Sequence, residues 1–229
     1  MDSATQRPRF RLAWVISGLW LILLCGVNAW ALSKLPQDAR VPIHWNVSGE
    51  IDGWAGRNSL WIVPGTLVGI TLLLAFLPRI EPRRENLIQS AGAYQAVWIG
   101  AVSLFSLLHL AIVSSALGHK VPMNLWAGLT VGLLFVVIGR VLGKVKSNYL
   151  MGIRTPWTLS SEYSWEVTHR LGGRLMMAFG VALATLALLD PPGWWLWGGM
   201  VGGLFLIIGA TFVVSYRAWK HDPSRSSRE

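Results

Sequence analysis

The segment between residues 34 and 57 holds the side chains best suited to chemistry in this chain. It contains one imidazole and two carboxylates, from His44, Glu50 and Asp52. Such a set could bind a divalent metal, but ligand type alone specifies little without supporting groups around it. The mixture of aromatic, imidazole, amide and carboxylate groups fits a cap that binds a ligand, and we expect no metal. The ligand-binding candidates are His44, Trp45, Asn46, Glu50, Asp52 and Trp54.

The local structure of this segment can also be predicted. Two prolines precede a short stretch at 41–45 that is typical of extended backbone, and a turn is expected at 46–49. Gly49 and Gly53 can adopt positive φ wherever the turn requires it. The segment is therefore predicted to be an ordered loop with one extended stretch.

A second segment, residues 140–174, is rich in charged and aromatic side chains. Ser160 is a suitable N-cap and Glu162 would lie in the first turn, near the positive end of a helix. We predict a short helix over 161–171, lying against the inner leaflet and ended by Gly172-Gly173. Two interpretations stay open, a charged connector or a contact surface for the inner leaflet or a cytoplasmic protein. The contact candidates are Arg154, Thr155, Pro156, Trp157, Glu162, Trp165, His169 and Arg170.

Long uncharged runs separate these charged segments. Only 14% of the 229 residues are charged and 53% are hydrophobic, whereas an ordinary soluble domain has roughly 25% charged residues. This excludes a disordered chain and a two-domain soluble enzyme. Because a helix needs about 20 apolar residues to cross a bilayer, we predict an all-α, polytopic membrane helix bundle, a single domain over 12–216. Its six transmembrane helices would span about 12–33, 58–78, 94–117, 121–139, 171–189 and 193–216.

Two of these spans have alternatives. The first run follows Arg7, Arg9 and Arg11, as the apolar part of a cleaved signal peptide would, but it is longer than the 7–15 residues of such a region. The run near 175–189 is the shortest of the six, so a re-entrant pair over 121–189 is the alternative to two full spans there. We retain all six spans.

The distribution of basic residues predicts the orientation. Sixteen of the 20 Lys and Arg residues fall in segments on the side of the N-terminus, and cytoplasmic loops carry such an excess. We therefore expect both termini in the cytoplasm, an extracytoplasmic loop at 34–57, a cytoplasmic loop at 140–174 and a cytoplasmic basic tail at 217–229. The net charge of +9 is then explained by the lipid bilayer as a partner, without direct nucleic-acid binding.

His109 is the ionisable residue predicted to lie in the middle of a span, whereas Arg174 near the start of the fifth span can extend its charge to the interface. Intramembrane ionisable groups are functional by default. Buried carboxylates, which proton-coupled transporters normally use, are not predicted there. Asn28 would form a hydrogen bond between helices. Small-residue pairs that allow close helix packing are Gly65/Gly69, Gly128/Gly132, Gly198/Gly202 and Gly199/Gly203.

Two motifs follow one another along the chain. The first comprises Leu35-Pro36, Val41-Pro42-Ile43-His44-Trp45-Asn46, Gly49-Glu50 and Asp52-Gly53-Trp54. The second comprises Gly152-Ile153-Arg154-Thr155-Pro156-Trp157-Thr158-Leu159-Ser160-Ser161-Glu162, Trp165 and Thr168-His169-Arg170-Leu171. In this order they resemble the Sdp immunity-protein (SdpI-like) family of bacterial integral membrane proteins. The resemblance implies a multi-pass protein of the bacterial cell (inner) membrane that protects the cell against a secreted toxic peptide. In the system after which the family is named, the protein also holds a cytoplasmic transcriptional repressor at the membrane. The resemblance therefore implies such a repressor as a further partner here.

We therefore expect an immunity and signalling protein, not an enzyme, that acts without a cofactor. It would bind or neutralise an extracellular peptide toxin, and a cytoplasmic transcriptional repressor is a further expected partner. Two alternatives stay open. Six spans and His109 would fit a small-solute transporter or channel, and His44, Glu50 and Asp52 would fit a membrane-embedded enzyme.

Overall fold

The computed structural model describes residues 10–224, so Arg7 and Arg9, and the end of the predicted basic tail from residue 225, lie outside the described residues. Within this range, six helices are long and apolar enough to cross a membrane. They confirm the predicted all-α polytopic bundle. These helices are α1 (Arg11–Lys34), α2 (Ile62–Phe76, extended by 3-10 turns to Arg57–Arg79), α4 (Ala91–Ala116), α5 (Met123–Leu142), α7 (Glu162–Leu188) and α8 (Gly193–Lys220).

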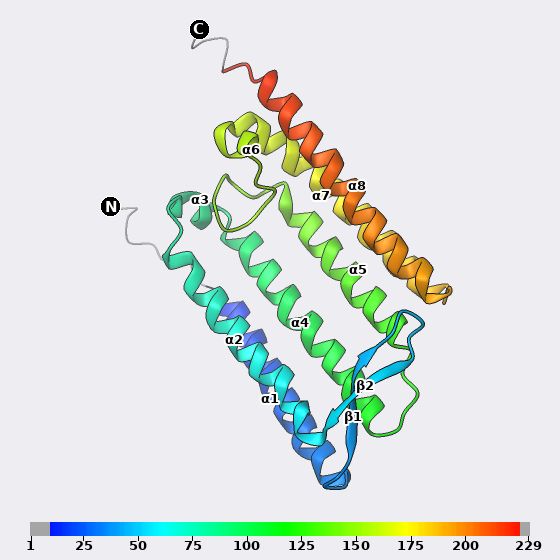
Figure 1. Ribbon diagram of the computed structural model, residues 1–229. Helices are drawn as coiled ribbons and strands as arrows, with labels where there is room; N and C mark the ends of the chain where they lie inside the picture. Colours follow the sequence, from blue (N-terminus) through cyan, green and yellow to red (C-terminus); the bar gives the residue numbers. More distant parts are fainter. Residues whose placement is uncertain (1–9, 225–229) are drawn as a thin grey trace.

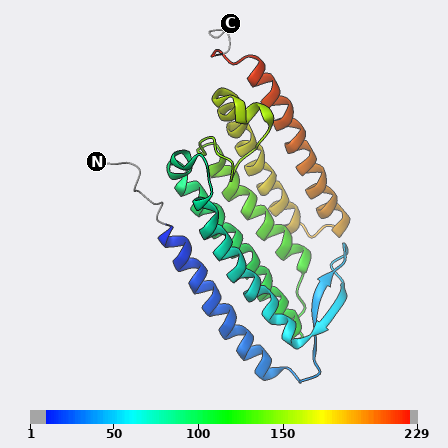
Figure 2. The ribbon, with the colours of Figure 1, turned by 60° about the vertical axis from the view of Figure 1, so that its left-hand side comes forward.

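The six helices form two groups of three (Figures 1 and 2). In the first group α1 and α2 pack against α4, and in the second group α5 and α8 pack against α7. The groups meet where α4 contacts α5. The start of α1 and the end of α8 lie at one end of the bundle with the short helices α3 (Arg84–Gln89) and α6 (Pro156–Ser160), and a β-hairpin lies at the opposite end (Figure 1).

The outward faces of the helices are apolar. Ile22, Phe205 and Leu206 leave 73%, 71% and 75% of their surface exposed. Soluble monomers rarely expose large contiguous apolar patches, whereas lipid tails are a favourable environment for such side chains. The buried positions, in contrast, include the small polar residues Ser17 and Ser106. This distribution is that of a multi-pass membrane protein.

Glycines allow α5 and α7 to pack closely. A Cβ atom on Gly180 would lie 2.4 Å from the carbonyl oxygen of Gly132. A Cβ on Gly139 would lie 2.5 Å from the carbonyl oxygen of Gly173. Because the neighbouring atoms belong to the backbone, they cannot move aside as a flexible side chain can. The two helices are therefore in contact largely backbone to backbone, as small residues permit in membranes.

The small-residue pairs expected from the sequence differ in what they contact. Gly128 and Gly132 lie in the α5–α7 interface, and Gly199 and Gly203 face Leu186 and Phe179 of α7. A Cβ on any glycine of the other two pairs, Gly65/Gly69 and Gly198/Gly202, would have no atom within 4 Å. Spacing alone thus does not show which glycines lie at an interface.

The extended stretch predicted at 41–45 is the first strand of a hairpin. Strand β1 (Arg40–Trp45) pairs antiparallel with β2 (Ile51–Gly56), which was not predicted. Gly49 has a φ of +82° in the turn, as expected. Gly53 does not need positive φ. Its role is to allow close approach, since a Cβ there would lie 2.7 Å from the Cβ of His44.

The hairpin is attached to both groups of helices. Val41 of β1 is buried in a cluster with Ala31, Leu60 and Val113, which belong to the first group and the 3-10 turn before α2. At the turn, the Asn124 side-chain amide of α5 donates to the Val47 carbonyl at 3.2 Å. The hairpin therefore bridges the two groups at this end of the bundle.

The segment at 140–174 differs from the prediction. Helix α7 runs without a break from Glu162 to Leu188, so the expected short helix over 161–171 is wrong. Its N-cap is Ser161 and not Ser160, and the Ser161 side chain accepts a hydrogen bond from the backbone N–H of Ser164 at 3.0 Å. A single helix of 27 residues also replaces the re-entrant alternative for 121–189.

Gly172 and Gly173 do not end this helix because packing requires them within it. A Cβ on Gly172 would lie 2.4 Å from the Ile153 side chain, and one on Gly173 would lie 2.7 Å from the carbonyl oxygen of Gly139. A glycine pair read in isolation indicates a helix end. Here the same pair allows the helix to pass close to its neighbours.

Candidate functional site

The turn of the hairpin and the connection between α4 and α5 line a shallow, open pocket of about 530 Å³, here called the outer pocket. The hairpin contributes an aromatic ring, a carboxylate and an aliphatic side chain, and the connection contributes an imidazole, an ammonium and apolar groups. The lining residues used below are Trp45, Glu50, Ile51, His119, Lys120 and Pro122.

The end of α4 places the cationic side of this pocket. Gly118 has a φ of +91°, and its N–H donates to the Ser115 carbonyl at 3.0 Å. The N–H of His119 donates to the Ser114 carbonyl at 3.2 Å. This helix ending, with a glycine in the left-handed backbone conformation, turns the chain sharply. The residues after Gly118 therefore reach the hairpin instead of continuing along the helix axis.

The predicted ligand-binding residues divide into three sets. Trp45 and Glu50 line the outer pocket. Asn46 stabilises the turn, because its side-chain oxygen accepts from the Glu50 N–H at 3.0 Å and its amide donates to the Glu50 carboxylate at 3.1 Å. His44 Nδ1 lies 2.5 Å from Asp52 Oδ1, and this pair and Trp54 are solvent-exposed.

These contacts do not form the metal site that the sequence left open. Glu50 interacts with Asn46, and His44 interacts with Asp52. Among residues 10–224, no group of three His, Cys, Asp or Glu side chains has a geometry suited to a metal ion.

At the opposite end of the bundle, residues 143–161 fold into a compact structure, here called the inner cap. Its attachment to the first helix group depends on Glu81, which is 5% exposed. The Glu81 carboxylate accepts hydrogen bonds from the backbone N–H of Arg83 at 2.8 Å and of Tyr149 at 3.2 Å. Asn148 shapes the next residues by accepting from the Leu150 and Met151 N–H groups at 2.9 Å.

Arg83 forms a second connection to the inner cap. Its guanidinium donates to the Leu159 carbonyl at 3.1 Å and to the Ser147 hydroxyl. It also lies 4.8 Å from the centre of the Tyr149 ring, a distance that favours a cation–π interaction. The inner cap therefore bridges the helix groups at this end, as the hairpin does at the other.

Trp165 and His169 of α7 form the buried support on which the inner cap packs. The Trp165 indole donates to the Val145 carbonyl at 2.7 Å and stacks on the His169 ring at 3.9 Å between centroids. His169 Nε2 accepts from the Ile153 N–H at 2.9 Å, and His169 Nδ1 lies 2.8 Å from the Trp165 carbonyl. One nitrogen must accept and the other must donate, so the geometry fits a neutral imidazole with its proton on Nδ1.

Polar contacts also attach the inner cap to the end of α8. The Thr155 hydroxyl, which caps α6, donates to the Ser215 hydroxyl at 3.1 Å. The Ser164 hydroxyl donates to the Ser215 carbonyl at 2.8 Å. The Ser161 hydroxyl donates to the Asp222 carboxylate at 2.5 Å. The start of α7 and the end of α8 are thus linked through serine and threonine side chains.

Only some of the predicted contact candidates in this segment are accessible. Thr155, Trp165 and His169 are buried and form the contacts described above. Trp157 is partly buried against Phe212 and Tyr216 of α8. The candidates that remain exposed are Arg154, Pro156, Glu162 and Arg170, of which Arg170 forms an ion pair with Glu166 at 2.8 Å.

His109 belongs to a buried hydrogen-bonded chain across the first helix group. Its Nε2 lies 2.8 Å from the side-chain oxygen of Asn28, and the Asn28 amide donates to the Leu60 carbonyl at 2.8 Å. The chain connects α4, α1 and the 3-10 turn before α2. Hydrogen bonds of this kind hold membrane helices together, and they give His109 a structural role.

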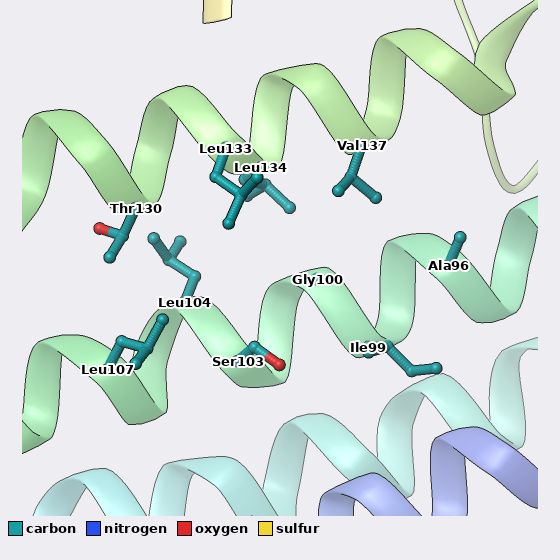
Figure 3. Close-up of a pocket in the computed structure, with 10 residues that line it drawn as sticks. All are labelled: Ala96, Ile99, Gly100, Ser103, Leu104, Leu107, Thr130, Leu133, Leu134 and Val137. Carbon is teal, nitrogen blue, oxygen red and sulfur yellow. The ribbon is translucent and has the colours of Figure 1, made fainter. Parts of the chain in front are cut away.

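A further pocket of about 360 Å³ lies between α4 and α5, within the membrane-spanning segments (Figure 3). Leu104 and Leu107 of α4 and Leu133 and Leu134 of α5 are among its lining residues. Each of its two hydroxyl groups has a partner within the bundle, because Ser103 accepts from the Trp20 indole at 3.0 Å and Thr130 donates to the Trp126 carbonyl at 2.7 Å, and the other lining side chains are apolar. The pocket is therefore suited to apolar groups and not to a polar solute.

Sequence reasoning missed the residues that complete both regions. Arg83 and Lys120 entered only as basic residues in the count that predicts the orientation. Glu81 and His119 were not considered, although a carboxylate among basic residues is a signal of a specific contact. The proximity of Lys120 and His119 to the hairpin turn is a tertiary contact that the spacing of the residues does not reveal.

Replacing Glu81 with glutamine is expected to loosen the inner cap. The amide would still accept from the two N–H groups, but it loses its charge, and hydrogen bonds to charged groups contribute about 1.5–3 kcal/mol each against about 0.5–1.5 for neutral ones. Hydrogen exchange at the Tyr149 amide should become roughly tenfold faster. Glu85→Gln, at an exposed position of α3, is the matched control, and equal exchange in both variants would contradict the role given to Glu81.

With this geometry described, the chain can be compared with known proteins. Residues 144–215 match the model of the SdpI/YfhL protein family, which here takes in most of the inner cap, α7 and most of α8. Over this part of its length the chain is similar to the SdpI/YfhL protein family. Residues 19–68, which include the hairpin, also match a domain of unknown function (DUF1648).

A curated relative is similar over a larger part of the chain. Immunity protein SdpI of Bacillus subtilis (strain 168) is 26% identical over 153 residues, which are 67% of this chain and 70% of that protein. No solved structure matches. One family match thus includes the hairpin at one end of the bundle, and the other includes most of the inner cap at the opposite end.

Proposed function

We propose that this chain is an immunity protein of the bacterial inner membrane that binds an extracellular toxic peptide at its hairpin end and neutralises it. The observation that carries the proposal is the match to a protein named as an immunity protein over two thirds of this chain. The excess of Lys and Arg on the side of the termini supports an outward-facing hairpin. In this proposal the protein acts by binding, without an enzymatic step or a cofactor.

The proposal includes a second partner at the inner cap, a cytoplasmic transcriptional repressor. The side chains available to it are exposed cations and carboxylates, among them Arg154, Glu162 and Lys144. Complementary charges on a partner would speed association and favour one binding orientation. The buried candidates Thr155 and Trp165 would act by holding this surface in shape.

Helix α8 is the element best placed to couple the two ends. It begins at Gly193, where a Cβ would lie 1.7 Å from the Val47 carbonyl oxygen of the hairpin turn. It ends beside the inner cap, where Ser215 and Asp222 accept hydrogen bonds from the residues around the start of α7. A shift of the hairpin on ligand binding would therefore act on a continuous helix whose other end contacts the inner cap.

The test is protection of a sensitive bacterium. The chain is expressed in a strain that is challenged with a panel of synthetic toxic peptides of the kind that bacteria secrete, with an empty vector as the control. We expect the lethal concentration of at least one peptide to rise by about tenfold or more, because peptide bound to the protein is withdrawn from its target. Unchanged survival across the panel, at equal amounts of protein in the membrane, would contradict the proposal.

A further inference from the structure

The cationic side of the outer pocket has no internal partner. The Lys120 ammonium is exposed, and no hydrogen bond or ion pair involves it within residues 10–224. His119 lies next to it in the same wall. In contrast, the Arg57 guanidinium near the base of the hairpin is already engaged, because it donates to the carbonyls of Leu32 and Leu35 at 3.1 Å and 2.6 Å. Lys120 is therefore available for an anionic group of a ligand.

The start of α5 adds to this positive potential. Val121 and Pro122 line the pocket and lead directly into the helix, whose N-terminus has no side-chain cap. The first N–H groups of a helix and its dipole both favour a negative charge nearby. The helix terminus thus reinforces the charge of Lys120 on the same wall.

The hairpin side of the pocket is suited to an apolar side chain and a peptide backbone. Trp45 and Ile51 supply apolar surface. The Glu50 carboxylate is held toward the turn by the Asn46 amide at 3.1 Å, so its charge is partly compensated. Its other oxygen can accept a hydrogen bond from a backbone N–H of a ligand.

We propose that the outer pocket binds the C-terminal end of a peptide. The terminal carboxylate lies on Lys120 and His119, and the last apolar or aromatic side chain packs against Trp45 and Ile51. That the physiological ligand is a peptide rests on the proposed function, whereas the preference for a carboxylate beside an apolar group rests on the pocket. Such a site would distinguish a free peptide terminus from a blocked one.

The direct test uses small probes and the full chain in nanodiscs of phosphatidylcholine, with binding measured by saturation-transfer NMR. The probes are N-acetyl-Leu-Phe as the free acid, the same dipeptide as its amide, and N-acetyl-Glu-Phe-amide, which carries its carboxylate on a side chain. We expect the free acid to bind about tenfold more tightly than the amide, since charge-assisted hydrogen bonds are about twice as strong as neutral ones. Equal binding of the acid and its amide, or preference for the side-chain carboxylate, would overturn the proposal.

Variants locate the binding. Lys120→Gln should reduce the affinity for the free acid by about tenfold and leave that for the amide unchanged, and Trp45→Ala should weaken both. Lys34→Gln, which changes an exposed cation outside the pocket, is the matched control and should bind as the parent does. Equal losses in Lys120→Gln and Lys34→Gln would overturn the proposal. Displacement of the free acid when phosphatidylglycerol is added to the discs would also overturn the proposal, because it would assign the pocket to a lipid headgroup.

The protection assay separates this inference from the proposed function. Protection that is retained in Lys120→Gln and is equal against free-acid and amidated forms of the peptide would remove the pocket assignment and leave immunity standing. Selective binding of the free-acid probe without protection against any peptide would remove the proposed immunity function and leave the pocket assignment standing.

Discussion

Replacing Gly180 with valine is expected to separate α7 from α5 and to lower the midpoint of thermal unfolding in detergent by roughly 10 °C. The added Cβ would lie 2.4 Å from the Gly132 carbonyl oxygen and 2.8 Å from the Val136 nitrogen. Both are backbone atoms, so one helix must move. Overpacking costs about 1–3 kcal/mol or more, and each kcal/mol shifts the midpoint of a chain of this size by about 2–4 °C.

Gly209→Val is the matched control for this prediction. Gly209 lies in α8, and a Cβ there would have no atom within 4 Å. Its midpoint should stay within about 2 °C of the parent, since substitutions that touch nothing usually change stability by less than about 0.5 kcal/mol. Similar losses in the two variants would show that the close contact of α5 and α7 does not determine stability.

Replacing Gly152 with alanine is expected to disrupt the inner cap. Gly152 has a φ of +119°, which side chains disfavour by about 1–2 kcal/mol. The new Cβ would also lie 2.4 Å from His169 Nε2 and 3.1 Å from the Trp165 ring. The His169 ring would have to turn away, and the hydrogen bond from the Ile153 N–H would be lost, at a further cost of about 1–3 kcal/mol for the unsatisfied buried group.

Gly118→Ala, in the α4–α5 connection beside the hairpin, controls for the general effect of placing a side chain at positive φ. Gly118 also has positive φ, at +91°, but a Cβ there would meet nothing within 4 Å. Limited proteolysis should cut residues 143–161 at least tenfold faster in Gly152→Ala than in the parent, and no faster in Gly118→Ala. If Gly118→Ala opened the inner cap equally, the contact between Gly152 and His169 would not be its organising feature.

The spans could be predicted from the sequence because the constraint on them is local. A bilayer requires about 20 apolar residues in succession, and that requirement can be read without knowing any neighbour. The first strand of the hairpin was predicted from similar local features. The second strand was not, because Ile51–Gly56 contains two glycines and an aspartate, which are depleted in strands, and its formation depends on pairing with β1.

Tertiary contacts decided the features that the sequence did not predict. Gly172-Gly173 was interpreted as a helix end, but these residues lie against Ile153 and Gly139, and the helix continues. Glu81 accepts from Tyr149, 68 residues away in sequence. The same limitation affects the candidate sites, because composition does not tell whether a tryptophan such as Trp165 is a buried support or an exposed contact.

The central claim is that the hairpin and the inner cap face opposite compartments, with the hairpin outside. Cysteine accessibility in intact cells tests it directly, using Cys25→Ala as the parent and single cysteines at two exposed positions, Ser48→Cys in the hairpin turn and Ser160→Cys in the inner cap. A membrane-impermeant maleimide should label the cysteine at 48 in intact cells, and the one at 160 only after the membrane is permeabilised. Labelling of both positions from the same side would contradict the account.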